Sequence, residues 1–95
     1  MTGKAFPDRV ALGAYNIDIH RIRNCTYPAY MEDTSRYNIL PYFIPLRALT
    51  NRDVDNLIVA GKCISQSFLV NSATRLHPIE FSTGQAAGVA ASYFT

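Results

Sequence analysis

The stretch that decides the fold lies in the second half of the chain. It opens with Leu-Ile-Val-Ala-Gly at 57–61, directly after a polar turn at 51–56. A short apolar run bounded by turn residues and glycine is typical of a strand covered on both faces, as in a parallel α/β sheet. The stretch continues with Ser-Ala-Thr-Arg-Leu-His-Pro at 72–78, and Pro78 suits the first turn of a helix. The order of strand, loop and helix therefore predicts an α/β fold.

The helix expected at 78–94 is rich in small residues, including Gly84 and Gly88. Each glycine costs about 1 kcal/mol relative to alanine in an exposed helix, so we expect close packing to compensate. The start of this helix would also direct unpaired N–H groups and a positive dipole end at an anionic ligand. The alternative is a plain packing helix.

The first half of the chain contains two candidate strands. Residues 10–20 begin with an apolar run and end in strict alternation, which would place Asp18 and His20 on one face of a strand. Residues 24–38 are polar and are expected to form a loop. Residues 37–46 are aromatic and β-branched but contain Pro41 and Pro45, so we expect an edge strand or an extended crossing segment.

Length and charge exclude several classes of protein. The chain has 95 residues, enough for one compact unit with a modest core. Its net charge of +2 comes from scattered Lys and Arg, so we expect no nucleic-acid partner. The longest apolar run, 39–46, is too short for a membrane span, and the first residues lack the apolar core of a signal peptide. We expect a soluble chain without a membrane partner, and its compartment stays open.

The cysteines and histidines do not form a metal motif. Cys25 and Cys63 are far apart in sequence, and so are His20 and His77, whereas zinc sites usually show two close pairs of ligands. We therefore expect no metal site and two buried free thiols.

Other polar residues have a functional and a structural interpretation. Gly61 would let a ligand approach the backbone, or it simply ends a strand. Arg75 could donate two hydrogen bonds to an anionic ligand, or it is a surface arginine. His77 either lines the same pocket or has a structural role beside Pro78. Arg47, which follows the aromatic segment, could pair with a carboxylate or stack on a ring, or it lies at the surface. Asp18 with His20 could form an acid/base pair, or both face water.

Taken together, the matching segments resemble the C-terminal part of FAD-dependent oxidoreductases related to glutathione reductase and fumarate reductase. The matching segments are 2–8, 11–20, 44–49, 54–65 and 84–91, which include Ile-Pro-Leu-Arg-Ala-Leu at 44–49 and Gly-Gln-Ala-Ala-Gly at 84–88. The resemblance implies part of an FAD-binding Rossmann-like domain at 51–95 and part of a β-rich substrate domain at 1–50. As an isolated fragment such a chain would be α+β.

The resemblance also implies roles for individual residues. The loop at 60–62 would pass the ribityl and pyrophosphate parts of FAD, and the start of the helix would offer N–H groups to the pyrimidine edge of the flavin. The helix would pack beneath the nucleotide-binding sheet, while 11–20 and Arg47 would belong to the substrate domain facing the flavin. The residues expected to bind the cofactor are Ala60, Gly61, Lys62, Pro78, Ile79 and Gly84. The expected catalytic residues are His20 and Arg75.

The chain also departs from the family pattern. The glycine fingerprint that cradles the pyrophosphate is absent. Lys62 stands where arginine is commoner, and 66–71 differs from the usual histidine-containing loop. The opening residues match an interior position of the family, so we expect a C-terminal fragment that binds FAD weakly or not at all. It would be inactive alone and would self-associate.

The expected partners are the remainder of the flavoprotein chain and a small-molecule substrate. Two other functions stay open. One is a non-enzymatic binding or structural module associated with polysaccharide, since some relatives carry the label xanthan lyase. The other is a small independent enzyme that uses Asp18, His20 and Arg75.

Overall fold

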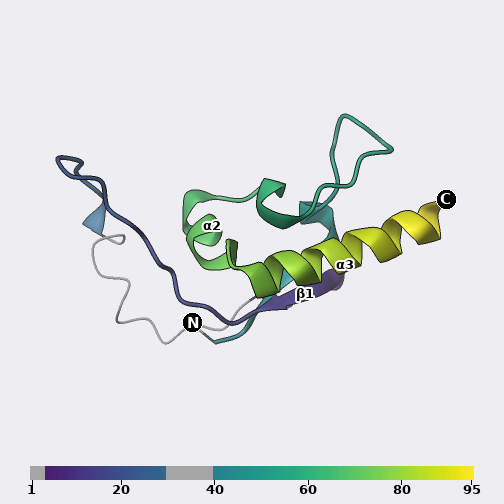
Figure 1. Cartoon of the computed structure of the whole chain (residues 1–95), viewed down its shortest axis with the longest axis horizontal. Helices are drawn as coiled ribbons and strands as arrows, with labels where there is room; N and C mark the ends of the chain where they lie inside the picture. Colours follow the sequence, from purple (N-terminus) through teal and green to yellow (C-terminus); the bar gives the residue numbers. More distant parts are fainter. Residues whose placement is uncertain (1–3, 30–39) are drawn as a thin grey trace.

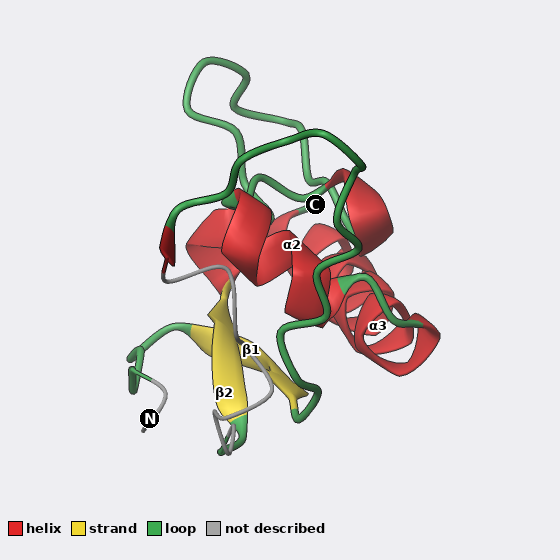
Figure 2. Ribbon diagram, turned by 90° about the vertical axis from the view of Figure 1, so that its left-hand side faces the viewer, coloured by secondary structure: helices red, strands yellow, loops and turns green. Residues whose placement is uncertain are grey.

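The computed structural model describes residues 4–29 and 40–95 (Figure 1). Most of the loop expected at 24–38, and the first residues of the family resemblance, lie outside this range. The described chain is a small α+β structure with one two-stranded antiparallel sheet and two helices (Figure 2). The described residues form no parallel sheet, and the α+β arrangement expected of an isolated fragment is observed.

The sheet pairs β1 (Arg9–Gly13) with β2 (Tyr42–Pro45). Leu12 lies opposite Phe43 and Gly13 opposite Tyr42, with an irregularity between Arg9 and Ala11. β2 thus confirms the extended structure expected at 37–46, as far as these residues are described. The strand expected to continue to His20 is wrong, because the chain leaves the sheet after Gly13 and runs irregularly (Figure 1).

The strand expected at 57–60 is also wrong. Ile58 forms a single antiparallel bridge with Thr50, and the Val59 amide donates to the Leu49 carbonyl at 2.7 Å. Leu57 is 43% exposed instead of covered. A strand needs a partner along its length, and among residues 4–29 and 40–95 this run pairs only with Leu49 and Thr50. Two 3₁₀ turns, Leu46–Ala48 and Gly61–Cys63, flank the region.

The two helices are α2 (Phe68–Thr74) and α3 (His77–Phe94). α3 confirms the helix expected from Pro78, which lies in its first turn. α2 was not predicted. Its N-cap is Ser67, whose hydroxyl accepts a hydrogen bond from the Val70 amide at 3.3 Å, as serine commonly does at this position.

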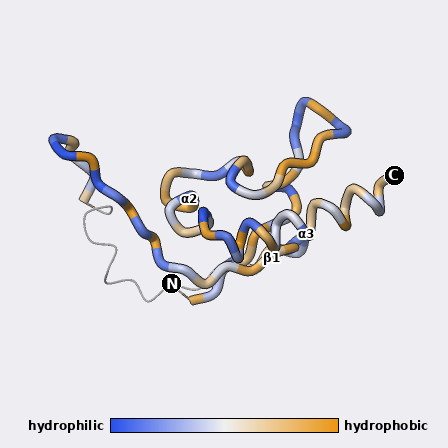
Figure 3. The backbone as a smooth tube through the Cα atoms, in the orientation of Figure 1, coloured by the Kyte–Doolittle hydropathy of each residue, from blue (hydrophilic) through white to orange (hydrophobic). Residues whose placement is uncertain are grey.

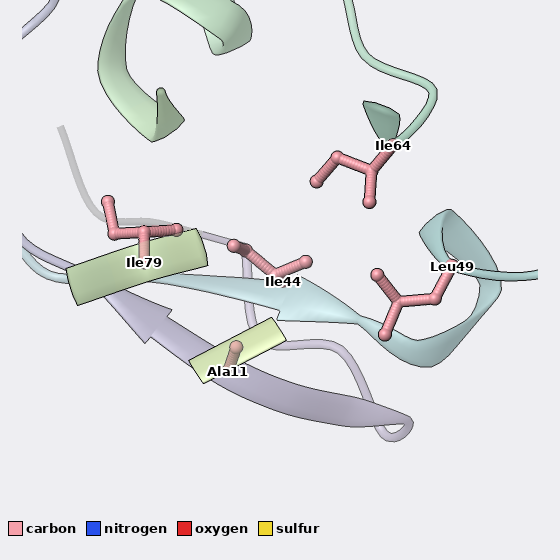
Figure 4. Packing of buried hydrophobic residues seen from close by; sticks show 5 residues of the cluster. All are labelled: Ala11, Ile44, Leu49, Ile64 and Ile79. Carbon is pink, nitrogen blue, oxygen red and sulfur yellow. The ribbon is translucent and has the colours of Figure 1, made fainter. Parts of the chain in front are cut away.

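One small core joins the strands to α3. It consists of Ala11 from β1, Ile44 from β2, Leu49 and Ile64 from the loops, and Ile79 from α3 (Figure 4). Tyr42 packs beside it and donates to the Ala73 carbonyl at 2.8 Å, which ties β2 to α2. Burial raises the pKa of Tyr42, so its hydroxyl remains a donor at neutral pH. The two segments assigned by resemblance to different domains share this core, and the boundary at residue 50 stays a prediction.

An ion pair fixes the segment before β1. Arg47 donates from Nε to Asp8 Oδ2 at 3.0 Å and from a terminal nitrogen to Oδ1 at 2.5 Å, and its backbone amide also donates to Oδ2 at 3.2 Å. The guanidinium lies 5.5 Å from the centre of the Phe6 ring. The expected pairing of Arg47 with a carboxylate is thus confirmed, and its place facing a flavin stays a prediction.

The pair predicts an acid-dependent loss of stability. The side-chain hydrogen bond from Arg47 holds the pKa of Asp8 well below its ordinary value of 3.8. A carboxyl with a lowered pKa stabilises the fold above its unfolded-state pKa, and this contribution disappears as pH falls below about 4. We expect urea unfolding at a series of pH values to show a smaller acid loss for Asp8→Asn than for the natural chain. Equal losses would contradict a contribution from the pair, and added salt should shrink the difference.

The C-terminal half of α3 has little cover. A Cβ at Gly84 or Gly88 would meet no atom within 4 Å, so the close packing expected there is not found among the described residues. Val89, Tyr93 and Phe94 are 65%, 84% and 69% exposed. Figure 3 shows no strongly hydrophilic residue along this half. The radius of gyration is 14.8 Å, against about 12 Å for a compact domain of this length.

Cys25 and Cys63 are both free but exposed, so their expected burial is wrong. Cys25 lies in the irregular segment after β1, and Cys63 ends a 3₁₀ turn. Within the described ranges, no helix combines the length and apolar character needed to cross a bilayer. The same residues contain no cluster of three or more His, Cys, Asp and Glu placed to hold a metal.

Candidate functional site

The loop at 60–62 is attached to the start of α3. Gly61 has a φ of 68°, in the left-handed region that favours glycine. Its amide donates to Thr83 Oγ1 at 3.2 Å, and the Thr83 hydroxyl donates to the Glu80 carbonyl at 3.0 Å. Thr83 is fully buried. The glycine loop is therefore fixed to the second turn of α3.

The side chains beside this contact carry opposite charges. Lys62 Nζ lies 3.5 Å from Glu80 Oε1, and the Glu80 side chain is 20% exposed. Glu80 Oε1 is buried and accepts no hydrogen bond from any described residue. A carboxylate in the first turn of a helix is stabilised by the helix dipole. Glu80 thus pairs with Lys62 beside the glycine loop.

The first turn of α3 satisfies two of its own amides. Ile79 and Glu80 both donate to the Leu76 carbonyl at 3.0 Å, and Pro78 has no N–H to offer. Ile79 is buried in the core, whereas Pro78 and Gly84 are exposed. The amide of Ile79, assigned by resemblance to the flavin, is therefore engaged within the helix.

A second cluster joins Asp18, His20 and Arg75. A terminal nitrogen of Arg75 donates to both the backbone carbonyl and Oδ2 of Asp18, each at 3.1 Å. Asp18 Oδ2 also lies 3.1 Å from His20 Nε2. The Asp18 amide donates to the Ser72 carbonyl at 3.4 Å, so the irregular segment after β1 is attached to α2.

The structure thus collects the predicted residues into two groups. One is the loop at 60–62 with the first turns of α3, and the other is His20 with Arg75. Arg75 caps the C-terminus of α2, two residues before α3 begins. The sequence analysis did not select Thr83 and Glu80 as site residues. They could have been selected because they are polar residues on a helix that is otherwise rich in small residues.

Gly61→Ala should lower the free energy of unfolding by about 1 kcal/mol, because alanine is strained at a positive φ. A Cβ at Gly61 would meet no atom within 4 Å, so the effect comes from the backbone alone. Gly61→Asn is the matched control, since asparagine tolerates this conformation better, and it should lose less. Equal stability of all three chains in urea would show that Gly61 is not held in this conformation.

The described chain is thus a small α+β structure in which a glycine turn is fixed to the start of a helix, beside the ion pair of Lys62 and Glu80. The family model described as FAD dependent oxidoreductase matches residues 1–95. The chain therefore belongs to the family of FAD-dependent oxidoreductases. Searches of curated proteins and of solved structures found no significant match.

Proposed function

We propose that this chain forms one wall of the FAD and substrate site of an oxidoreductase, together with further polypeptide of the same flavoprotein. The observation that carries the proposal is the hydrogen bond from the Gly61 amide to Thr83, which holds the glycine loop against α3. Membership of an FAD-dependent family indicates FAD as the cofactor. The loop at 60–62 would lie along it.

The donors and acceptors near the loop suit FAD. The space above Gly61 is open, so a ligand can approach the backbone there. The Lys62 ammonium would offer positive charge to a pyrophosphate. The Glu80 carboxylate, 3.5 Å from Lys62 Nζ, would keep that ammonium beside the loop. These groups would hold and orient the cofactor.

The second cluster would face the substrate. A bound flavin supplies hydride acceptance, and the protein supplies orientation and charge. His20 is the most exposed member of its cluster, with 74% of its side chain accessible, so it can reach a bound molecule. Arg75 contributes positive charge beside it. We assign His20 to proton exchange with a small-molecule substrate and Arg75 to substrate orientation.

A flavin titration tests the proposal. We expect this chain alone to bind FAD weakly or not at all, because its sequence lacks the glycine fingerprint that cradles the pyrophosphate. A longer version of the natural protein should show flavin absorbance bands. In that version Lys62→Ala should weaken binding severalfold, whereas Arg52→Ala, which removes another exposed cation, should not. No flavin binding in either length would overturn the proposal and favour a non-enzymatic binding module.

The exposed half of α3 would contact the remaining polypeptide. Two grooves flank it, one of about 640 Å³ against β1 and one of about 620 Å³ against the loop at 50–58. Without such cover, we expect copies of this chain to self-associate through the same face. Light scattering should show a mass that rises with concentration, and Val89→Lys should reduce it, whereas Arg52→Ala should not. A monomer at every concentration would contradict self-association.

A further inference from the structure

Asp18 is the only residue of the second cluster that contacts both other members in the described structure. Its Oδ2 atom lies 3.1 Å from Arg75 and 3.1 Å from His20. Its backbone is also fixed, because its carbonyl accepts from Arg75 at 3.1 Å and its amide donates to Ser72 at 3.4 Å. Side chain and main chain of Asp18 are thus tied to the corner between α2 and α3.

The three side chains of the cluster differ in their solvent exposure. The side chains of Arg75 and Asp18 are 37% and 41% exposed, whereas that of His20 is 74% exposed. The two less exposed residues form the base of the cluster, and the imidazole is its accessible end. Order imposed on Asp18 is therefore passed to His20 through one hydrogen bond.

We propose that Asp18 is a positioning residue, which holds the His20 ring with its proton on Nε2 and so leaves Nδ1 to exchange protons with the substrate. A neutral imidazole has one N–H and one unprotonated nitrogen, and the partner of one nitrogen decides which is which. A carboxylate accepts only, so Nε2 is the donor. The assignment of a substrate to His20 rests on the proposed function, but the state of the ring does not.

The proton step follows from this tautomer. A proton on an O–H or N–H group of the substrate would pass to Nδ1, and the electron pair of the broken bond would stay on the substrate. The resulting imidazolium would keep its Nε2 hydrogen bond to the Asp18 carboxylate. Arg75 offsets part of the carboxylate charge and keeps it in place.

Long-range ¹H–¹⁵N correlation spectra of the 95-residue chain test the proposal. They should be recorded at alkaline pH, because the proposal concerns the neutral imidazole, which has one N–H. The two ring nitrogens of His20 should have the shifts of an Nε2–H tautomer. His77 is exposed and serves as an internal reference in the same sample. We expect the preference for Nε2–H to be stronger in His20 than in His77.

Substitutions distinguish positioning of the His20 ring by Asp18 from a general effect of removing a carboxylate. Asp18→Ala should lower the ratio of the two His20 tautomers about fivefold, the scale of a half-exposed charged hydrogen bond. Asp18→Asn keeps the shape without the charge and should give an intermediate ratio. Asp53→Ala removes a carboxylate that contacts Arg52 and should change nothing at His20.

The backbone amide spectrum reports whether each variant keeps its fold. A His20 ratio equal to that of His77, or one unchanged in folded Asp18→Ala and Asp18→Asn, would overturn the proposal. The measurement needs neither flavin nor turnover, so failure to bind FAD would sink the proposed function and leave this result standing.

Discussion

Leu49→Ala is expected to lower the free energy of unfolding by roughly 3 kcal/mol, because it removes buried methyl groups and leaves a cavity. Leu49 has no exposed surface and joins the core beside Ile44 and Ile64. Natural domains are stable by only about 5–15 kcal/mol, so this one change would remove a large share of the total. Urea unfolding followed by circular dichroism measures the loss.

Leu57→Ala is the matched control for this experiment. Leu57 is 43% exposed and stands outside the core, so the same chemical change should cost less than about 1 kcal/mol. Similar losses in the two variants would mean that the core is not centred on Leu49. A Leu49→Ala chain that fails to fold at all is also compatible with the predicted size of the effect, and Leu49→Val then gives a milder test.

Gly13→Ala should destabilise the chain by about 1–3 kcal/mol through overpacking. A Cβ on Gly13 would lie within 3 Å of the Tyr42 ring, which covers this glycine from the opposite strand. The ring has little freedom to move, because the Tyr42 hydroxyl donates to the Ala73 carbonyl at 2.8 Å. Thermal and urea unfolding should both record the loss.

Gly88→Ala provides the opposite result with the same chemical change. Gly88 lies in α3 and a Cβ there would meet open space, so alanine should stabilise the helix by up to about 1 kcal/mol. A destabilised Gly88→Ala chain would show that another copy or segment packs closely on this glycine in solution. A harmless Gly13→Ala would show that Tyr42 does not cover Gly13.

The helix at 77–94 was predictable because its signals are local. Pro78 marks the first turn, and the small residues that follow are compatible with a helix. Gly61 was recognisable as the end of an apolar run, but its positive φ is seen only in the structure. The family was also predictable, because its motifs follow one another in the right order along the whole chain.

The strands were harder to predict because pairing is not local. The run at 57–60 has the composition of a buried strand, yet among the described residues it pairs only with Leu49 and Thr50. The alternation at 17–20 predicts a strand face, but the chain there binds α2 instead of the sheet. α2 itself was missed because its seven residues are too few for a clear helical period.

The candidate site shows the same division. Asp18 and His20 were expected to be neighbours, and they are, although through an irregular segment and not through a strand. The contact between Asp18 and Arg75 spans 57 residues, so only the folded structure reveals it. Pairing of Arg47 with a carboxylate was predicted, but its partner was not, since Asp8 is 39 residues away.

The uneven cover of α3 has a consequence for how the helix opens. Its first turns are tied down by Ile79 and Thr83, whereas its last turns end in Tyr93 and Phe94 without cover from the described residues. The last turns of α3 alone are too short to be stable as a helix in water without packing. In the monomer, amide hydrogen exchange should therefore be slow near Thr83 and quicken toward Phe94. A partner that binds the C-terminal turns of α3 should slow this amide exchange. It should also protect Tyr93 and Phe94 from proteases that cut after aromatic residues.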